Sequence, residues 1–168
     1  MTDITSTGRL ALLQEFERMD ADNDGSVDLA DFLRTPRLIL ADLGEPEGSE
    51  KGRAFVAANE TQWNVLLALG DADADGVLSA DEYVALRTSA GFRSPDRPGK
   101  GEVCRTLFDL LDRDGDETLD VDEFLRAAAF FCMPEADARS YFGRLDADGD
   151  STLDRTEFTS AVKLFYGG

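Results

Sequence analysis

The chain has 168 residues and a net charge of −18, from 35 acidic and 17 basic side chains. This charge would repel nucleic acid and anionic membrane surfaces, so neither is an expected partner. Histidine, the commonest general base, is absent, and we find no zinc-ligand cluster, phosphate-binding glycine loop or nucleophile motif, which argues against an enzyme.

The first predicted helix precedes residue 20, where apolar residues recur at helical spacing. These residues are Leu12, Leu13, Phe16 and Met19. A second element is expected after Thr35, which would cap a new short helix that begins at Pro36 and is ended by Gly44. The stretch EPEGSEKG, residues 45–52, then predicts a linker.

Further apolar-periodic segments predict helices along the rest of the chain. They cover residues 55–69, 83–86, 103–111, 124–125, 141–145 and 158–165. Between them, FRSPDRPGKG at residues 92–101 contains two prolines and two glycines. We therefore expect a linker over 93–100 that joins an N-terminal domain, residues 1–92, to a C-terminal domain, residues 101–168.

An acidic twelve-residue segment occurs four times between these helices. The copies are DADNDGSVDLAD (20–31), DADADGVLSADE (71–82), DRDGDETLDVDE (112–123) and DADGDSTLDRTE (146–157). Each has Asp at positions 1, 3 and 5 and a carboxylate at position 12. A single acidic run is usually a solvated loop, but four copies with one spacing do not arise by chance.

This spacing suits a calcium ion, which takes six to eight oxygen ligands. A twelve-residue loop can supply side-chain oxygens from positions 1, 3 and 5, the carbonyl of position 7 and both carboxylate oxygens of position 12. Up to four Ca²⁺ sites are therefore predicted, in which the cation holds together carboxylates that would otherwise repel. The predicted ligands are Asp20, Asp22, Asp24, Ser26, Asp31, Asp71, Asp73, Asp75, Val77, Glu82, Asp112, Asp114, Asp116, Thr118, Glu123, Asp146, Asp148, Asp150, Thr152 and Glu157.

In its ligand types, their spacing and the flanking helices, nearly the whole chain resembles a protein with four EF-hands. The resemblance implies an all-α fold in which two EF-hand pairs pack compactly. Paired loops are expected to form short antiparallel β-contacts through their aliphatic position 8, loop one with loop two and loop three with loop four. The uneven loop spacing is similar to that of the sarcoplasmic calcium-binding proteins and bacterial relatives such as calerythrin.

Two departures from the EF-hand pattern bear on affinity. Loop 20–31 ends in Asp31, whose side chain is one methylene shorter than Glu, so we expect the weakest Ca²⁺ binding and the strongest Mg²⁺ competition there. Loops three and four carry Glu117 and Ser151 at position 6, where a left-handed turn favours glycine. The strain is on the order of 1 kcal/mol, so both loops are still expected to bind.

The resemblance implies intracellular Ca²⁺ binding and leaves its purpose open. With three methionines in the whole chain, the Met-rich groove of an opening sensor is missing, which favours a Ca²⁺ buffer or transporter that tightens on binding. The alternative is a sensor or regulator that exposes an apolar cleft to a basic amphipathic peptide. Because no secretory signal or bilayer-length apolar stretch is present, we expect a cytoplasmic protein. We also expect it to be a monomer.

Overall fold

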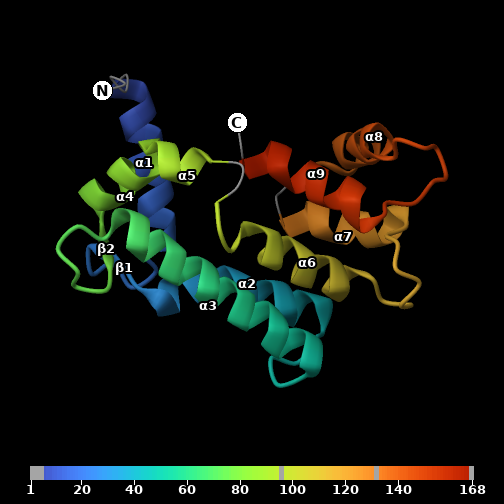
Figure 1. Cartoon of the computed structure of the whole chain (residues 1–168), viewed down its shortest axis with the longest axis horizontal. Coiled ribbons are helices and arrows are strands. Elements are labelled where there is room, and N and C mark those ends of the chain that lie inside the picture. The colour runs from blue at the N-terminus through green and yellow to red at the C-terminus, as the bar shows by residue number, and fades with distance from the viewer. Residues whose placement is uncertain (1–5, 95–96, 131–132, 167–168) are drawn as a thin grey trace.

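The computed structural model describes residues 6–94, 97–130 and 133–166, and most of these residues are helical. Each acidic loop connects an entering helix to an exiting helix (Figure 1). The elements are α1 (Ser6–Met19), β1 (Ser26–Val27), α2 (Leu29–Leu43), α3 (Glu50–Gly70), β2 (Leu78–Ser79), α4 (Ala80–Thr88), α5 (Ala90–Arg93), α6 (Lys100–Leu111), α7 (Val121–Phe130), α8 (Glu135–Leu145) and α9 (Arg155–Tyr166).

The loops pair through their aliphatic position 8, as the sequence predicts. Val27 of β1 lies opposite Leu78 of β2 in an antiparallel two-stranded sheet. Leu119 and Leu153 form the equivalent antiparallel bridge, with N–H to carbonyl distances of 2.9 Å in both directions. All four side chains are almost completely buried, so each pair of loops is fixed by both backbone hydrogen bonds and apolar packing.

Helix α2 runs unbroken through Pro36, so the prediction of a new helix starting there was wrong. An internal proline costs about 3 kcal/mol because it removes one helical hydrogen bond and crowds the preceding turn. On either side of it, Leu33, Ile39 and Leu40 are buried, and each such side chain contributes about 1.5–3 kcal/mol. Burial therefore outweighs the proline penalty, and the helix ends at Gly44 as predicted, with φ +70°.

Helix α3 begins at Glu50, inside the segment 45–52 that was predicted to be a linker. Ser49 is its N-cap, because the Ser49 hydroxyl oxygen accepts a hydrogen bond from the Gly52 N–H at 2.9 Å. The linker is therefore limited to residues 45–49. The resulting helix is the longest in the molecule, and Figure 1 shows it running from the β1–β2 sheet towards the C-terminal half.

Buried side chains from both halves of the chain form one shared core. Its N-terminal members lie on α2 and α3 and include Leu40 and Phe55. They pack with Leu107, Phe108 and other residues of α6 to α9. A second, smaller cluster around Phe16 and Trp63 fills the N-terminal pair, and the half-buried Phe32 packs against both clusters. The two EF-hand pairs are thus joined through α2 and α3 rather than separated by a free linker.

The connection between the pairs is short. Helix α5 ends at Arg93 and α6 begins at Lys100, so both end residues of the predicted linker, 93 and 100, are helical. Within the described ranges, no helix is both long enough and apolar enough to cross a membrane.

Candidate metal centre

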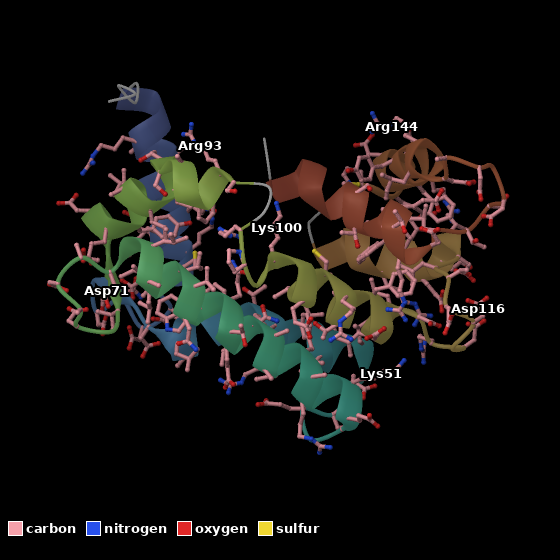
Figure 2. The ribbon with its side chains drawn as sticks, viewed as in Figure 1. Lys51, Asp71, Arg93, Lys100, Asp116 and Arg144 are labelled. Atoms are coloured by element: carbon pink, nitrogen blue, oxygen red, sulfur yellow. The ribbon has the colours of Figure 1, made fainter. Side chains whose placement is uncertain are left out.

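Carboxylates gather at all four loops of the described chain. In each loop, oxygens of three acidic residues lie within 4.8 Å of one another, close enough to share one cation. The groups are Asp20, Asp22 and Asp24; Asp71, Asp73 and Glu82; Asp112, Asp114 and Glu123; and Asp146, Asp148 and Glu157. Figure 2 shows Asp71 and Asp116, from loops two and three, near opposite ends of the molecule.

The aspartate at position 1 organises each loop from inside. In loop two, Asp71 Oδ1 accepts the N–H of Asp75 at 3.3 Å, and its Oδ2 accepts the N–H of Gly76 at 3.0 Å. In loop three, Asp112 accepts the N–H groups of Gly115 at 2.7 Å and Glu117 at 3.2 Å. These bonds curl the backbone around the carboxylate, so the acidic side chains converge on one point.

The carboxylate at position 12 ties the two ends of its loop together. In loop two, Glu82 Oε1 accepts the N–H of Ala72 at 2.8 Å, and its Oε2 accepts the N–H of Ser79 at 3.0 Å. The same two bonds recur at Asp31, Glu123 and Glu157. Because both oxygens are already oriented towards the loop, the geometry suits bidentate coordination.

Position 9 caps the exiting helix, a role that the sequence analysis missed. Ser79 and Glu82 form a capping box at the start of α4, and Asp28 and Asp31 do the same for α2. Asp120 accepts the N–H of Glu123 at 2.8 Å, and Asp154 accepts that of Glu157 at 2.8 Å. The pattern of Ser or Asp followed three residues later by an acid was visible in the sequence as a capping signal.

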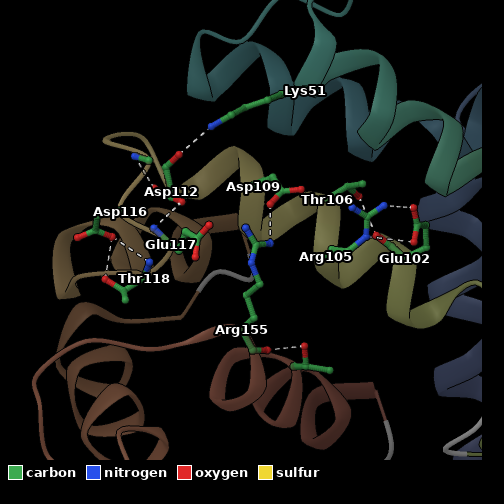
Figure 3. A network of polar contacts seen from close by, with 12 residues as sticks. Lys51, Glu102, Arg105, Thr106, Asp109, Asp112, Asp116, Glu117, Thr118 and Arg155 are labelled. Atoms are coloured by element: carbon green, nitrogen blue, oxygen red, sulfur yellow. Dashed lines mark hydrogen bonds and ion pairs between the residues drawn. The ribbon is translucent and has the colours of Figure 1, made fainter.

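Position 5 is held by position 7 in every loop. Asp116 Oδ1 accepts both the N–H of Thr118 at 2.9 Å and its hydroxyl at 2.8 Å (Figure 3). Equivalent bonds link Asp24 to Ser26, Asp75 to Val77 and Asp150 to Thr152. In loops two to four, the position 5 carboxylate does not belong to the group whose oxygens lie within 4.8 Å of one another.

Loop one differs from the other three in its acidic group. The carboxylates that lie within 4.8 Å of one another are at positions 1, 3 and 5 in loop one, and at positions 1, 3 and 12 in the other loops. Asp31 still bonds to the N–H of Ala21 at 3.0 Å. The shorter Asp31 side chain thus keeps its contacts with the loop backbone but does not join the central group.

Charge repulsion is visible at Asp22. The Asp24 N–H lowers the pKa of Asp22, but desolvation and the negative charges of Asp24, Asp31 and Asp20 outweigh it, so the net pKa is raised. At two other loop carboxylates, hydrogen bonds lower the pKa. The Ser26 hydroxyl lowers the pKa of Asp24, and the Ser79 N–H lowers that of Glu82. A cation among these groups would relieve the repulsion at Asp22.

A lysine side chain from the N-terminal half contacts loop three. Lys51, near the start of α3, donates from Nζ to the backbone carbonyl of Asp112 at 2.8 Å (Figure 3). Nearby, Arg155 at the start of α9 pairs with Asp109 of α6 at 2.6 Å and lies over the Phe108 ring. The first contact links the two halves, and the second links the helices that flank loops three and four.

Two residues in each loop adopt a left-handed backbone. In loops one and two they are Asn23 and Gly25, and Ala74 and Gly76; in loops three and four they are Gly115 and Glu117, and Gly149 and Ser151. Positions 4 and 6 are therefore both left-handed throughout. Each loop has glycine at only one of them, position 6 in the N-terminal pair and position 4 in the C-terminal pair.

The sequence and the fold are similar to those of known proteins. Residues 102–163 match the EF-hand domain pair family, and residues 13–34 match the EF hand family. The beta chain of a sarcoplasmic calcium-binding protein from Penaeus sp. is 30% identical over 129 residues, which cover 70% of this chain and 66% of that protein. The chain thus spans just under two thirds of the length of this relative.

Two bacterial proteins are similar over more of their length. Calerythrin from Saccharopolyspora erythraea is 23% identical over 82% of this chain and 78% of its own. The solved structure of a Streptomyces coelicolor calcium-binding protein superposes with a TM-score of 0.70, at 27% identity, over 95% of this chain and 98% of that one. The chain is accordingly an EF-hand calcium-binding protein, similar to the sarcoplasmic calcium-binding proteins, calerythrin and the Streptomyces protein.

Proposed function

We propose that this protein is a cytoplasmic, monomeric Ca²⁺ buffer or transporter, without catalytic activity, that tightens when its four loops fill. The single observation that carries this proposal is the shared core. Leu40 and Phe55 from the N-terminal half pack with Leu107 and Phe108 from the C-terminal half. Opening either EF-hand pair to accept a partner would break this packing, whereas simple ion binding would not.

The surface supports the same proposal. In the described chain, four large apolar side chains are exposed, Leu10, Leu29, Leu38 and Leu69. They are distributed over α1, α2 and α3. Isolated exposed leucines are normal on soluble proteins, and a sensor groove would require a larger contiguous patch.

Charge gives the reason for tightening. Positions 1, 3, 5, 9 and 12 of the loops hold 19 of the 35 acidic residues. Four Ca²⁺ ions would change the net charge from −18 to −10. Filling the loops therefore removes much of the repulsion that opposes the compact state, and binding is coupled to folding.

The second candidate is a Ca²⁺ sensor or regulator that binds a basic amphipathic peptide. It is favoured by a cavity of about 790 Å³ that is lined by apolar residues of both halves. The Streptomyces structure is described as a basis for calcium-mediated regulation by that protein. The acidic outer surface would attract a basic helix, and separation of the halves would expose the aromatic side chains of the cavity to the apolar face of that helix.

The decisive experiment is to titrate the chelated protein with Ca²⁺ in millimolar Mg²⁺. Exposed apolar surface is followed by an uncharged solvatochromic dye and by retention on a phenyl-agarose column. A buffer shows a low or falling signal and no Ca²⁺-dependent retention. If both signals rise as the sites fill, the protein is a sensor. The Glu157→Gln variant, which should bind one ion fewer, tests whether any change follows site occupancy.

A further inference from the structure

We propose that the cavity between the two EF-hand pairs binds an apolar small molecule with one negatively charged group, such as a long-chain carboxylate. The cavity has a volume of about 790 Å³, within the range of about 300–1,000 Å³ typical of small-molecule sites. Aromatic side chains line it from both halves, among them Trp63, Phe92, Phe124 and Phe158. An elongated apolar body would be in contact with rings along its length.

The charge of the cavity lining is the reverse of the charge of the chain. Acids outnumber bases by 35 to 17 overall. Around the cavity, the described lining contains five cationic residues, Arg18, Arg34, Arg87, Arg97 and Lys100, and two acidic ones, Glu15 and Asp31. Glu15 is already paired with Arg87. The lining therefore favours an anion in a protein whose remaining surface repels anions.

A buried amide side chain of α3 also lines the cavity. Gln62 is 7% exposed, and its Oε1 has no hydrogen-bond partner among the described residues. Asn59, one helical turn earlier on α3, is also buried, but its Nδ2 donates to the Phe55 carbonyl at 2.8 Å. Oε1 is an acceptor and does not itself bind a carboxylate. Because no hydrogen bond from the described residues holds Oε1, the amide can rotate and present its N–H donors instead, so this side chain can serve as a ligand contact.

The linker segment next to two of the cations packs on this amide. A Cβ on Gly99 would lie 2.7 Å from Gln62 Oε1, so the linker backbone packs directly on the Gln62 side chain. Arg97 and Lys100 flank Gly99 and line the same cavity. Arg97 is 9% exposed, and its guanidinium carbon lies 4.3 Å from the centre of the Phe92 ring. Figure 2 shows Lys100 between the two halves. A carboxylate in this part of the cavity could contact the buried Arg97, the half-buried Lys100 and the Gln62 amide.

The test uses the full-length, Ca²⁺-loaded protein and cis-parinarate, a fluorescent long-chain carboxylate. Trp63 is the one tryptophan of the chain and lines the cavity, so excitation of Trp63 reports bound parinarate by energy transfer. We expect saturable binding of one molecule per chain. The methyl ester of the same probe, which lacks the charge, should bind at least about tenfold more weakly.

A matched pair of variants tests the position of the charged end. Arg97→Gln should weaken parinarate binding at least about tenfold, and Arg97→Lys should restore part of it. Arg93→Gln removes the same charge from an exposed residue that does not line the cavity, and should bind as the wild type does. Helical circular dichroism and the number of bound Ca²⁺ ions confirm that each variant is folded.

Three results would overturn the proposal. They are the absence of saturable one-to-one binding, equal binding of acid and ester, and equal effects of Arg97→Gln and Arg93→Gln. If Arg97→Gln does not fold, the comparison of acid with ester still decides the outcome on the wild-type protein. The acid–ester and Arg97–Arg93 comparisons are made within one Ca²⁺-loaded state and report the position of the charged end. The buffer proposal is decided separately by the dye and phenyl-agarose measurements, so the failure of one is distinguishable from the failure of the other.

Discussion

The two EF-hand pairs build the same loop backbone with glycine in different places. In the N-terminal pair, glycine is at position 6, and position 4 holds Asn23 or Ala74. In the C-terminal pair, glycine is at position 4, and position 6 holds Glu117 or Ser151. Both positions are left-handed in every loop, with φ between +60° and +92°. Each loop thus tolerates one strained residue, and the identity of position 6 alone is a poor guide to whether a loop is intact.

The pairs also differ in how position 1 holds the loop. In loops three and four, Asp112 and Asp146 accept the N–H of the glycine at position 4, at 2.7 and 2.8 Å. In loops one and two, Asp20 and Asp71 bond to position 5, at 3.2 and 3.3 Å. Asp146 of loop four makes this bond as well, at 3.1 Å. The bond from position 1 to the N–H of position 4 therefore distinguishes the C-terminal pair, in which position 4 is glycine.

The largest expected effect is the loss of Ca²⁺ from both pairs. Each site filled at about 100 times its dissociation constant adds about 2.7 kcal/mol to the free energy of unfolding. We therefore expect chelator to lower the melting temperature strongly, in one transition because the core is shared. Circular dichroism and Trp63 fluorescence should give the same midpoint. A melting temperature indifferent to chelator, or separate transitions for the two pairs, would contradict this.

The next largest effect concerns the position 12 carboxylate, which is Asp31 in loop one and Glu82 in loop two. Asp31→Glu should tighten Ca²⁺ at loop one and reduce Mg²⁺ competition, because the longer side chain reaches the central carboxylate group. The reverse change, Glu82→Asp, should weaken loop two. Isothermal titration in the presence and absence of Mg²⁺ measures both. An unchanged loop-one affinity in Asp31→Glu would show that side-chain length does not limit this site.

Glycine placement gives a smaller effect. Ala74→Gly and Glu117→Gly should each raise the free energy of unfolding by about 1 kcal/mol, because glycine adopts a left-handed backbone without steric cost. Gly76→Ala should lower it by a similar amount, and an added Cβ there meets no atom within 4 Å, so only backbone strain contributes. Glu117→Gln controls for the lost charge. Urea denaturation checks the series, and stabilisation by Glu117→Gln equal to that by Glu117→Gly would refute the backbone explanation.

The smallest effect is expected at two ion pairs that occupy equivalent places in the two EF-hand pairs. Asp109 on α6 pairs with Arg155 on α9 at 2.6 Å, and Arg9 on α1 pairs with Asp81 on α4 at 2.7 Å. Arg155 also stacks on Phe108. Arg155→Gln should cost about 1 kcal/mol, and Arg9→Gln less than about 0.5 kcal/mol, because that pair is more exposed. Equal losses in urea denaturation would show that the ring contact contributes nothing.

The sequence predicted the repeated part of the molecule best. Four loops with one spacing identified the carboxylates that the structure brings together, and the aliphatic position 8 predicted the contacts of Val27 with Leu78 and Leu119 with Leu153. These features depend on local spacing, which can be read directly from the chain. The assignment of each residue as a ligand remains a prediction.

Features that depend on distant residues could not be predicted. Pro36 signals a helix start by local rules, yet α2 continues through it because Leu33, Ile39 and Leu40 are buried in the shared core. The cavity with a reversed charge is formed by residues of both halves, and no local pattern reports it. The left-handed backbone at Ala74 likewise follows from closure of the loop and not from residue preference.

The shared core also constrains how the chain is made. During synthesis, α2 and α3 leave the ribosome before α6 to α9 exist. Their faces around Leu40 and Phe55 then have no covering helices, although the acidic loops can already gather ions. The N-terminal pair must therefore wait for helices α6 to α9 before its apolar side is covered. The strong negative charge of the first loops, which repels copies of the same nascent chain, would keep such half-made molecules apart.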